Sequence, residues 1–136
     1  MQKKSRIIVD TNIWISFLIS KRLRKLENLF NNDKFVFVFS KELLEEFVEV
    51  AARPKFKKYF ERKDVERLLD IIENIAEVVK VKSKVNKCRD EKDNFLLALA
   101  KDSKADYLLT GDDDLLVLKR FHATQIVTYT KFSSKI

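Results

Sequence analysis

The sequence predicts an α/β protein in which helices cover both faces of a mostly parallel, five-stranded sheet. Short apolar runs alternate along the chain with longer segments of helical periodicity, an order typical of such three-layer folds. The run at residues 35–39 is apolar at every position, as expected for a strand covered on both faces. Glycine occurs once in 136 residues, at Gly111, so we expect helix to dominate.

The first half of the chain contains two predicted strands and four predicted helices. Ser40 is placed to cap the helix after the second strand, and Pro54 can occupy the first turn of a short helix. Apolar residues at helical spacing define the longer helices. In order, we expect a strand at 6–10, a helix at 13–31, a strand at 35–39 and helices at 41–50, 55–60 and 64–75.

The second half continues the alternation. A polar, basic loop at 82–92 separates the third predicted strand from a helix that is apolar enough to be buried. Beyond the loop, apolar runs bounded by polar residues indicate two more strands. In order, we expect a strand at 77–81, a helix at 94–101, a strand at 107–110, a helix at 113–120 and a strand at 125–129.

Composition limits the type of protein. A chain of 136 residues with 46% hydrophobic content suits one compact domain, residues 1–136, with one core. Cys88 is the sole cysteine, which excludes an internal disulfide and a cysteine-based zinc site and fits a cytoplasmic protein. The apolar stretch near the N-terminus meets Asp10 too early for a signal peptide or membrane span. A net charge of +7 favours an anionic partner such as nucleic acid, or serves solubility alone.

Acidic residues follow two of the predicted strands. Asp10 ends the strand at 6–10, and Asp112 follows the strand at 107–110 through Gly111. Asp93 starts a predicted helix, and Glu46 lies within the helix after Ser40. The carboxyl ends of parallel strands form the ligand-binding edge of an open sheet, so these acids can meet in one cleft. Crowded carboxylates with oxygen-only ligation favour Mg²⁺ or Mn²⁺ and metal-assisted displacement at phosphorus.

Each acid also has a structural interpretation. Asp93 and Asp112 precede helical stretches, where an aspartate commonly caps the helix, and Asp113 is more consistent with an exposed first-turn residue. Asp10 has no helix-cap role as obvious. Periodicity does not distinguish Glu45 from Glu46, because both flank the buried face of their helix about equally.

Several motifs in this order resemble the PIN-domain ribonucleases, and among them the toxins of prokaryotic toxin–antitoxin systems. The matching segments are Val9-Asp10-Thr11-Asn12, Ser40 with Glu46 six residues later, Arg53-Pro54-Lys55-Phe56, Asp90 and Asp93 before Leu97-Ala98-Leu99-Ala100, and Ala105-Asp106-Tyr107-Leu108-Leu109-Thr110-Gly111-Asp112. The resemblance implies a PIN-like fold and a Mg²⁺- or Mn²⁺-dependent endoribonuclease that cleaves single-stranded RNA. It also implies a cognate antitoxin protein, and a homodimer is a further expectation.

The resemblance assigns roles to residues of this chain. It implies that the metal-binding, catalytic acids are Asp10, Glu46, Asp93 and Asp112, with Asp114 as a further ligand and Asp90 as a supporting acid. It thereby favours Glu46 over Glu45. Asn12, Ser40 and Thr110 match polar positions that orient these acids or the metal-bound water. The pattern lacks none of the four acids, so an active enzyme is expected.

Contacts with RNA are expected from three further residues. Arg89 and Lys92 flank the expected metal site and can meet phosphates, whereas the basic groups at 21–25 and 55–63 suit ordinary solvated surfaces. Trp14 is placed to stack on a base, although tryptophan near a core more often packs there. His122 is isolated and lies beside no serine or cysteine motif, which argues against a histidine-based nucleophilic mechanism.

Two alternative functions remain. A haloacid-dehalogenase-like phosphatase would use Asp10 as the nucleophile, Ser40 and the turn at Gly111, but it requires an aspartate where this chain has Asn12. It would also leave Glu46 and Asp93 without roles. The second alternative is a non-catalytic module that binds RNA or another protein, against which four acids in the expected positions argue.

Overall fold

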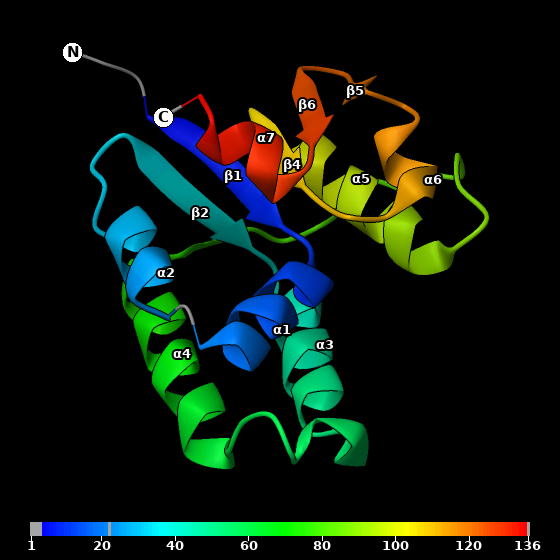
Figure 1. Ribbon diagram of the computed structural model, residues 1–136. Coiled ribbons are helices and arrows are strands. Elements are labelled where there is room, and N and C mark those ends of the chain that lie inside the picture. The colour runs from blue at the N-terminus through cyan, green and yellow to red at the C-terminus, as the bar shows by residue number, and fades with distance from the viewer. Residues whose placement is uncertain (1–3, 22, 136) are drawn as a thin grey trace.

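The computed structural model describes residues 4–21 and 23–135 (Figure 1). The strands are β1 (Ser5–Val9), β2 (Phe35–Phe39), β3 (Glu77–Val78), β4 (Tyr107–Leu109), β5 (Arg120–Phe121) and β6 (Thr124–Val127). The helices are α1 (Thr11–Ser20), α2 (Leu23–Phe30), α3 (Lys41–Ala51), the 3₁₀ turn η1 (Pro54–Phe56), α4 (Arg62–Ile75), α5 (Glu91–Ser103), α6 (Asp113–Leu116) and α7 (Tyr129–Ser133). Strands and helices alternate along the chain, as the sequence predicts.

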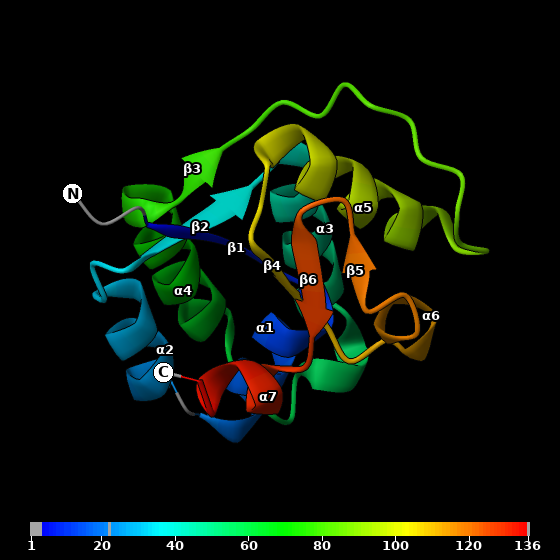
Figure 2. The same cartoon turned by 90° about the horizontal axis from the view of Figure 1, so that it is seen from above.

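The sheet is mostly parallel. Within the described residues it has six strands in the order β3-β2-β1-β4-β6-β5, and only the pairing of β5 with β6 is antiparallel. The central pair is β1 and β4, with Val9 opposite Leu109 at their carboxyl ends. Figure 2 shows α5 on one side of the sheet and α1, α2 and α7 on the other. The fold class predicted from the sequence is therefore confirmed, with a short sixth strand added at one edge.

Aromatic packing attaches α1 and α2 to the sheet. Trp14 of α1 is fully buried and stacks on Phe30 of α2, with ring centroids 5.4 Å apart. The same indole lies against Phe37 and Phe39 of β2. Burying an indole of this size stabilises the fold by a few kcal/mol, roughly the cost of truncating a buried tryptophan. This packing fixes α1, and with it the residues that follow β1.

The prediction of a single helix at 13–31 is wrong, because this segment forms two helices, α1 and α2. Lys21 ends α1 in the left-handed region, with φ 57°, and its amide bonds back to carbonyls in the last turn of α1. The break turns α2 so that Phe30 reaches Phe37, edge to face at 4.7 Å. Neither glycine nor asparagine marks this C-cap in the sequence.

Other boundaries also differ from the prediction. The helix predicted at 94–101 begins at Glu91 and ends at Ser103, because Asp90 caps its first turn. The strand predicted at 125–129 ends at Val127, and Thr128 accepts a hydrogen bond from the Lys131 amide to start α7. The helix predicted at 113–120 ends at Leu116, and β5 follows it.

Ser40 caps α3, as predicted, by accepting a 3.0 Å hydrogen bond from the Leu43 amide. Pro54 starts only a 3₁₀ turn, shorter than the helix expected at 55–60, and the strand expected at 77–81 is confined to two residues. Among the described residues, no helix has the length and apolar character needed to cross a membrane.

Candidate metal centre

The centre lies at the carboxyl ends of β1 and β4. Asp10 directly follows β1, and Asp112 follows β4 after Thr110 and Gly111. Since β1 and β4 are parallel neighbours in register, their carboxyl ends deliver both aspartates to the same edge of the sheet. Two neighbouring strands thus place the acids where open α/β sheets bind ligands.

Asp10 occupies the N-cap position of α1, but its carboxylate makes no capping hydrogen bond. Instead, its Oδ2 accepts a 2.8 Å hydrogen bond from the Thr110 hydroxyl. Only 8% of Asp10 is exposed, and this burial raises the pKa of its carboxyl group, while the Thr110 hydrogen bond opposes the rise. The Thr110 hydrogen bond fixes this carboxylate at the carboxyl end of β1, where it is placed to serve a ligand.

Thr110 links Asp10 to Asp112. The Thr110 hydroxyl oxygen that donates to Asp10 also accepts a 3.1 Å hydrogen bond from the Asp112 amide. The Asp112 side chain accepts a 2.9 Å hydrogen bond from the Asp114 amide and so caps α6. Asp112 therefore has both roles that the sequence suggests, as a cap and as a member of the acidic centre.

Asp93 lies in the first turn of α5, where Asp90 and not Asp93 provides the cap. Its side chain is 4% exposed, and its Oδ2 has no hydrogen-bond partner. Burial, together with the negative charge of Asp112, raises the pKa of Asp93 to about 7. An unpaired carboxylate oxygen in a buried position costs free energy unless a cation or proton satisfies it.

Three acids approach closely enough to share one ion. Asp93, Asp112 and Asp114 each offer a carboxylate oxygen, and these oxygens lie within 4.8 Å of one another. The ligand set consists of oxygen atoms, which suits a hard divalent cation such as Mg²⁺ or Mn²⁺. The unpaired Asp93 oxygen and the crowded charges both fit a bound cation, since it would satisfy the first and neutralise the second.

Asp10 and Glu46 lie outside this three-acid group. Asp10 is near enough for its charge to contribute to the raised pKa of Asp93. Glu46 is half-buried on α3, whereas Glu45 is exposed and forms a 4.0 Å ion pair with Lys41. The metal-binding role expected for Glu46 stays a prediction.

The remaining polar positions have separate structural roles. Asn12 is exposed in the first turn of α1, and the hydrogen bond from its backbone amide opposes the rise that burial causes in the pKa of Asp10. Ser40 is fully buried and its hydroxyl caps α3, while Asp90 caps α5. Of the expected supporting residues, Thr110 is the one whose side chain bonds directly to a site acid.

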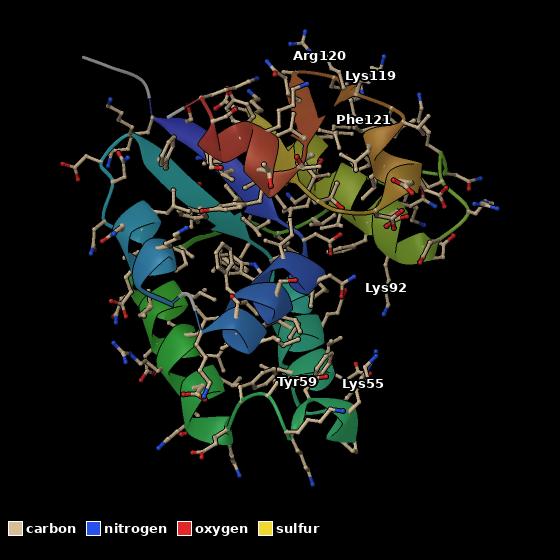
Figure 3. The ribbon with its side chains drawn as sticks, viewed as in Figure 1. Lys55, Tyr59, Lys92, Lys119, Arg120 and Phe121 are labelled. Atoms are coloured by element: carbon tan, nitrogen blue, oxygen red, sulfur yellow. The ribbon has the colours of Figure 1, made fainter. Side chains whose placement is uncertain are left out.

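Arg89 contacts the acidic centre directly. One guanidinium nitrogen donates to both carboxylate oxygens of Asp114 at 3.1 Å, and the Arg89 side chain is 88% exposed. Lys92 is exposed, and in Figure 3 its side chain extends from α5 toward the bottom of the view, away from Lys119 and Arg120. Both cations remain accessible to a polyanion.

The expectation that Trp14 stacks on a base is wrong. The indole has no exposed surface, and its ring nitrogen donates a 3.2 Å hydrogen bond to the Val9 carbonyl. Its faces are occupied by phenylalanine rings of the core. The packing role, which the sequence also allowed, is the one the structure supports.

Asn94 is a positioning residue that the sequence pattern did not reveal. It is 3% exposed, and its amide oxygen accepts hydrogen bonds from the Lys87 and Cys88 amides at 3.0 and 2.7 Å. Its amide nitrogen donates to the Cys88 carbonyl at 2.9 Å. These bonds hold the loop before Arg89 against α5. The position of Asn94 directly after Asp93 was the signal available in the sequence.

The conformation of Gly111 does not require glycine, because its φ is not positive. A Cβ atom at this position would meet no heavy atom of residues 4–21 and 23–135 within 4 Å. Turn geometry therefore gives no reason for a glycine at this position. Close approach of a ligand to the backbone is compatible with the open space.

The fold and the acidic edge define an α/β protein whose site suits a divalent cation. A sequence model of the PIN domain matches residues 6–114, which includes the three close acids, Asp10 and Glu46. The chain belongs to the PIN domain family, whose members are generally metal-dependent nucleases.

The chain is also similar to individual proteins, among them one relative by sequence and one solved structure. Uncharacterized protein MJ1680 of Methanocaldococcus jannaschii is 31% identical over 119 residues, which cover 85% of this chain and 76% of that protein. The solved structure of the T. brucei RRP44 PIN domain has a TM-score of 0.49 and 15% sequence identity, and the match covers 98% of this chain and 80% of that one.

Proposed function

We propose that this protein is a Mg²⁺- or Mn²⁺-dependent endoribonuclease that cleaves phosphodiester bonds of single-stranded RNA. The observation that carries the proposal is the buried, unpaired Oδ2 of Asp93 among the close oxygens of Asp112 and Asp114. A divalent cation bound at such a site supplies Lewis-acid stabilisation of a phosphoryl oxygen and activates water at neutral pH. The three acids would hold the cation, with Asp10 and Glu46 as additional ligands.

The residues around the acids support this chemistry. Thr110 holds the Asp10 carboxylate in one orientation by donating a hydrogen bond to its Oδ2. Arg89 and Lys92 are exposed beside the acids and offer positive charge to the RNA backbone. The net charge of +7 gives the whole protein an attraction for polyanions.

The test is cleavage of a defined pool of single-stranded RNA with Mn²⁺, Mg²⁺ or EDTA, followed by mapping of the fragment ends. Asp112→Asn keeps an N-cap residue for α6 but removes the charge, and we expect a loss of at least about 100-fold in cleavage. Asp113→Asn is the matched control, because Asp113 is exposed and lies in the same turn. It should cleave like the wild type.

Other outcomes distinguish the alternatives. Metal-independent cleavage that survives Asp112→Asn would contradict the mechanism. A phosphoryl group covalently attached to Asp10 would support the phosphatase instead. Binding of RNA without cleavage at any metal concentration would favour the non-catalytic module.

The same proposal includes a biological role as the toxin of a toxin–antitoxin pair, supported by the resemblance of the motif pattern. Expression of the wild type should then arrest growth, and Asp112→Asn should not. A small gene adjacent to this one should encode a protein that relieves the arrest and blocks RNA cleavage. Sedimentation of the free protein tests the expected homodimer.

A further inference from the structure

A pocket opens beside the acidic centre, between α1, the end of β4 and the start of α7. Its volume is about 320 Å³, at the lower end of the range for small-molecule sites. Its walls include Ser16 and Ser20 of α1, Thr110 and Gly111 after β4, and Thr128 and Tyr129 at the start of α7. The pocket therefore shares two residues with the turn that carries Asp112.

Thr110 connects the pocket to the acids. It lines the pocket, and its hydroxyl donates to Oδ2 of Asp10 while accepting from the Asp112 amide. A ligand in the pocket would consequently contact Thr110, which is itself hydrogen-bonded to Asp10 and Asp112. The pocket is placed to receive a part of the substrate adjacent to the reacting phosphate.

The lining favours a neutral, flat group over a phosphate. None of its described residues carries a charge, so a phosphate would find no cation there. Phe17 and Tyr129 supply aromatic surface, with their rings edge to face at 5.0 Å. Apolar and aromatic walls with a few hydroxyl groups are the usual environment of a bound nucleobase.

The serine hydroxyls favour a ligand that donates hydrogen bonds. Ser16 donates its proton to the Asn12 carbonyl at 3.0 Å, and Ser20 donates to the Phe17 carbonyl at 3.3 Å. Since the protons are used within α1, the oxygen lone pairs remain as acceptors. Amino and imino groups on the edge of a base are donors of the required kind.

Gly111 leaves space at the border of the pocket and the acidic turn. It lines the pocket, and a Cβ there would meet no atom of the described residues within 4 Å. The part of the chain that the structure describes leaves this space open.

We propose that this pocket is a nucleobase subsite, which binds the base of one RNA nucleotide next to the phosphodiester presented to the acids. The subsite rests on the proposed ribonuclease function. It would give the enzyme a preference for certain bases at one nucleotide adjacent to the cleaved phosphodiester bond.

The test measures base binding separately from cleavage. Because Gly111 is the only glycine, protein labelled with ¹⁵N-glycine gives a single backbone amide signal, located at the pocket. In metal-free buffer we titrate it with each of the four ribonucleosides, which have no phosphate, and with ribose 5-phosphate. At least one nucleoside should shift the Gly111 signal in a saturable way, and ribose 5-phosphate should not.

Ser16→Leu fills the pocket from an exposed position on α1 and should weaken nucleoside binding at least tenfold. Ser134→Leu is the matched control, since Ser134 is exposed, directly follows α7, donates to the Lys131 carbonyl of that helix and lies outside the pocket lining. If no nucleoside shifts the signal, or if Ser16→Leu binds as the wild type does, the subsite is wrong. Nucleoside binding with no RNA cleavage under any metal condition would retain the subsite and overturn the ribonuclease proposal.

Discussion

The Thr110 hydroxyl donates a 2.8 Å hydrogen bond to the carboxylate of Asp10, a residue 100 positions earlier in the chain. Both groups are buried at the carboxyl ends of the two central strands. The register of β1 and β4 thus determines the orientation of a site acid. Substitution of Thr110 therefore tests whether this hydrogen bond contributes to metal binding as well as to the stability of the fold.

Thr110→Val should reduce metal affinity by about 10- to 100-fold, the usual effect of removing a group that orients a ligand. It should also cost about 1–3 kcal/mol of stability, because the buried Asp10 oxygen loses its donor. Isothermal titration with Mn²⁺ and urea unfolding measure the two effects.

Thr124→Val is the matched control for this loss. Thr124 is equally buried and donates to the Ala105 carbonyl, away from the acids. It should lose stability but keep metal affinity and cleavage. An equal loss of metal affinity in both variants would show that Thr110 acts through general stability alone.

The raised pKa of Asp93 predicts that the metal-free protein loses stability as the pH rises. The carboxyl titrates at about 7 in the folded protein, against a usual value of 3.8. Between these values the folded state retains a proton that the unfolded chain releases. The free energy of unfolding therefore falls as the pH rises through this window, by an amount on the order of a few kcal/mol.

Unfolding in EDTA at about pH 5 and about pH 8 checks this effect. The side chain in Asp93→Asn cannot ionise. The free energy of unfolding of this variant should therefore fall less between the two pH values than that of the wild type. Taking the difference between the two proteins removes the contribution of the other titrating groups. Identical pH dependence of the two proteins would refute the raised pKa.

Arg89→Gln should weaken RNA binding with little change in the stability of the protein. The ion pair with Asp114 is mostly exposed, and such pairs contribute about 1 kcal/mol or less. The affinity for RNA falls as salt rises, and loss of one phosphate contact should make the slope of log affinity against log salt concentration shallower by about 0.7. Arg67→Gln on α4, which removes a comparable ion pair with Glu27 of α2, provides the control. Equal salt slopes for wild type and Arg89→Gln would exclude the contact.

Gly111→Ala should stabilise the protein and impair its activity. With a φ that is not positive and open space around the Cβ, alanine should raise stability by about 0.4–1 kcal/mol through the unfolded chain. The added methyl group should lower kcat/KM for RNA by roughly tenfold, because it displaces the substrate near the acids. Unchanged kcat/KM would mean that no ligand approaches this backbone.

The sequence predicted the elements best where one strong local signal was present. The all-apolar run of β2 and the Ser40 cap of α3 lie where expected, because strand burial and capping are local properties. The break at Lys21 and the β5–β6 hairpin were missed. Lys21, Lys119 and His122 adopt left-handed conformations without being glycine or asparagine, so tertiary packing overrides their local preference.

The site was partly predictable for the same reason. Strand ends identified Asp10 and Asp112, but only the structure shows that Asp90 and not Asp93 caps α5. The hydrogen bonds of Asn94 and the Arg89–Asp114 pair join segments whose proximity depends on the fold. No spacing rule in a single sequence contains that information.

The central claim is that the carboxylate of Asp93, whose Oδ2 is unpaired, completes a divalent-cation site. Binding of Mn²⁺, followed by electron paramagnetic resonance of the free ion, tests this claim most directly. The wild type should bind Mn²⁺ in competition with Mg²⁺, Asp93→Asn should bind it at least tenfold more weakly, and the exposed neighbour variant Asp113→Asn should match the wild type. Mn²⁺ binding that is absent from the wild type, or equal in the wild type and Asp93→Asn, would contradict the account.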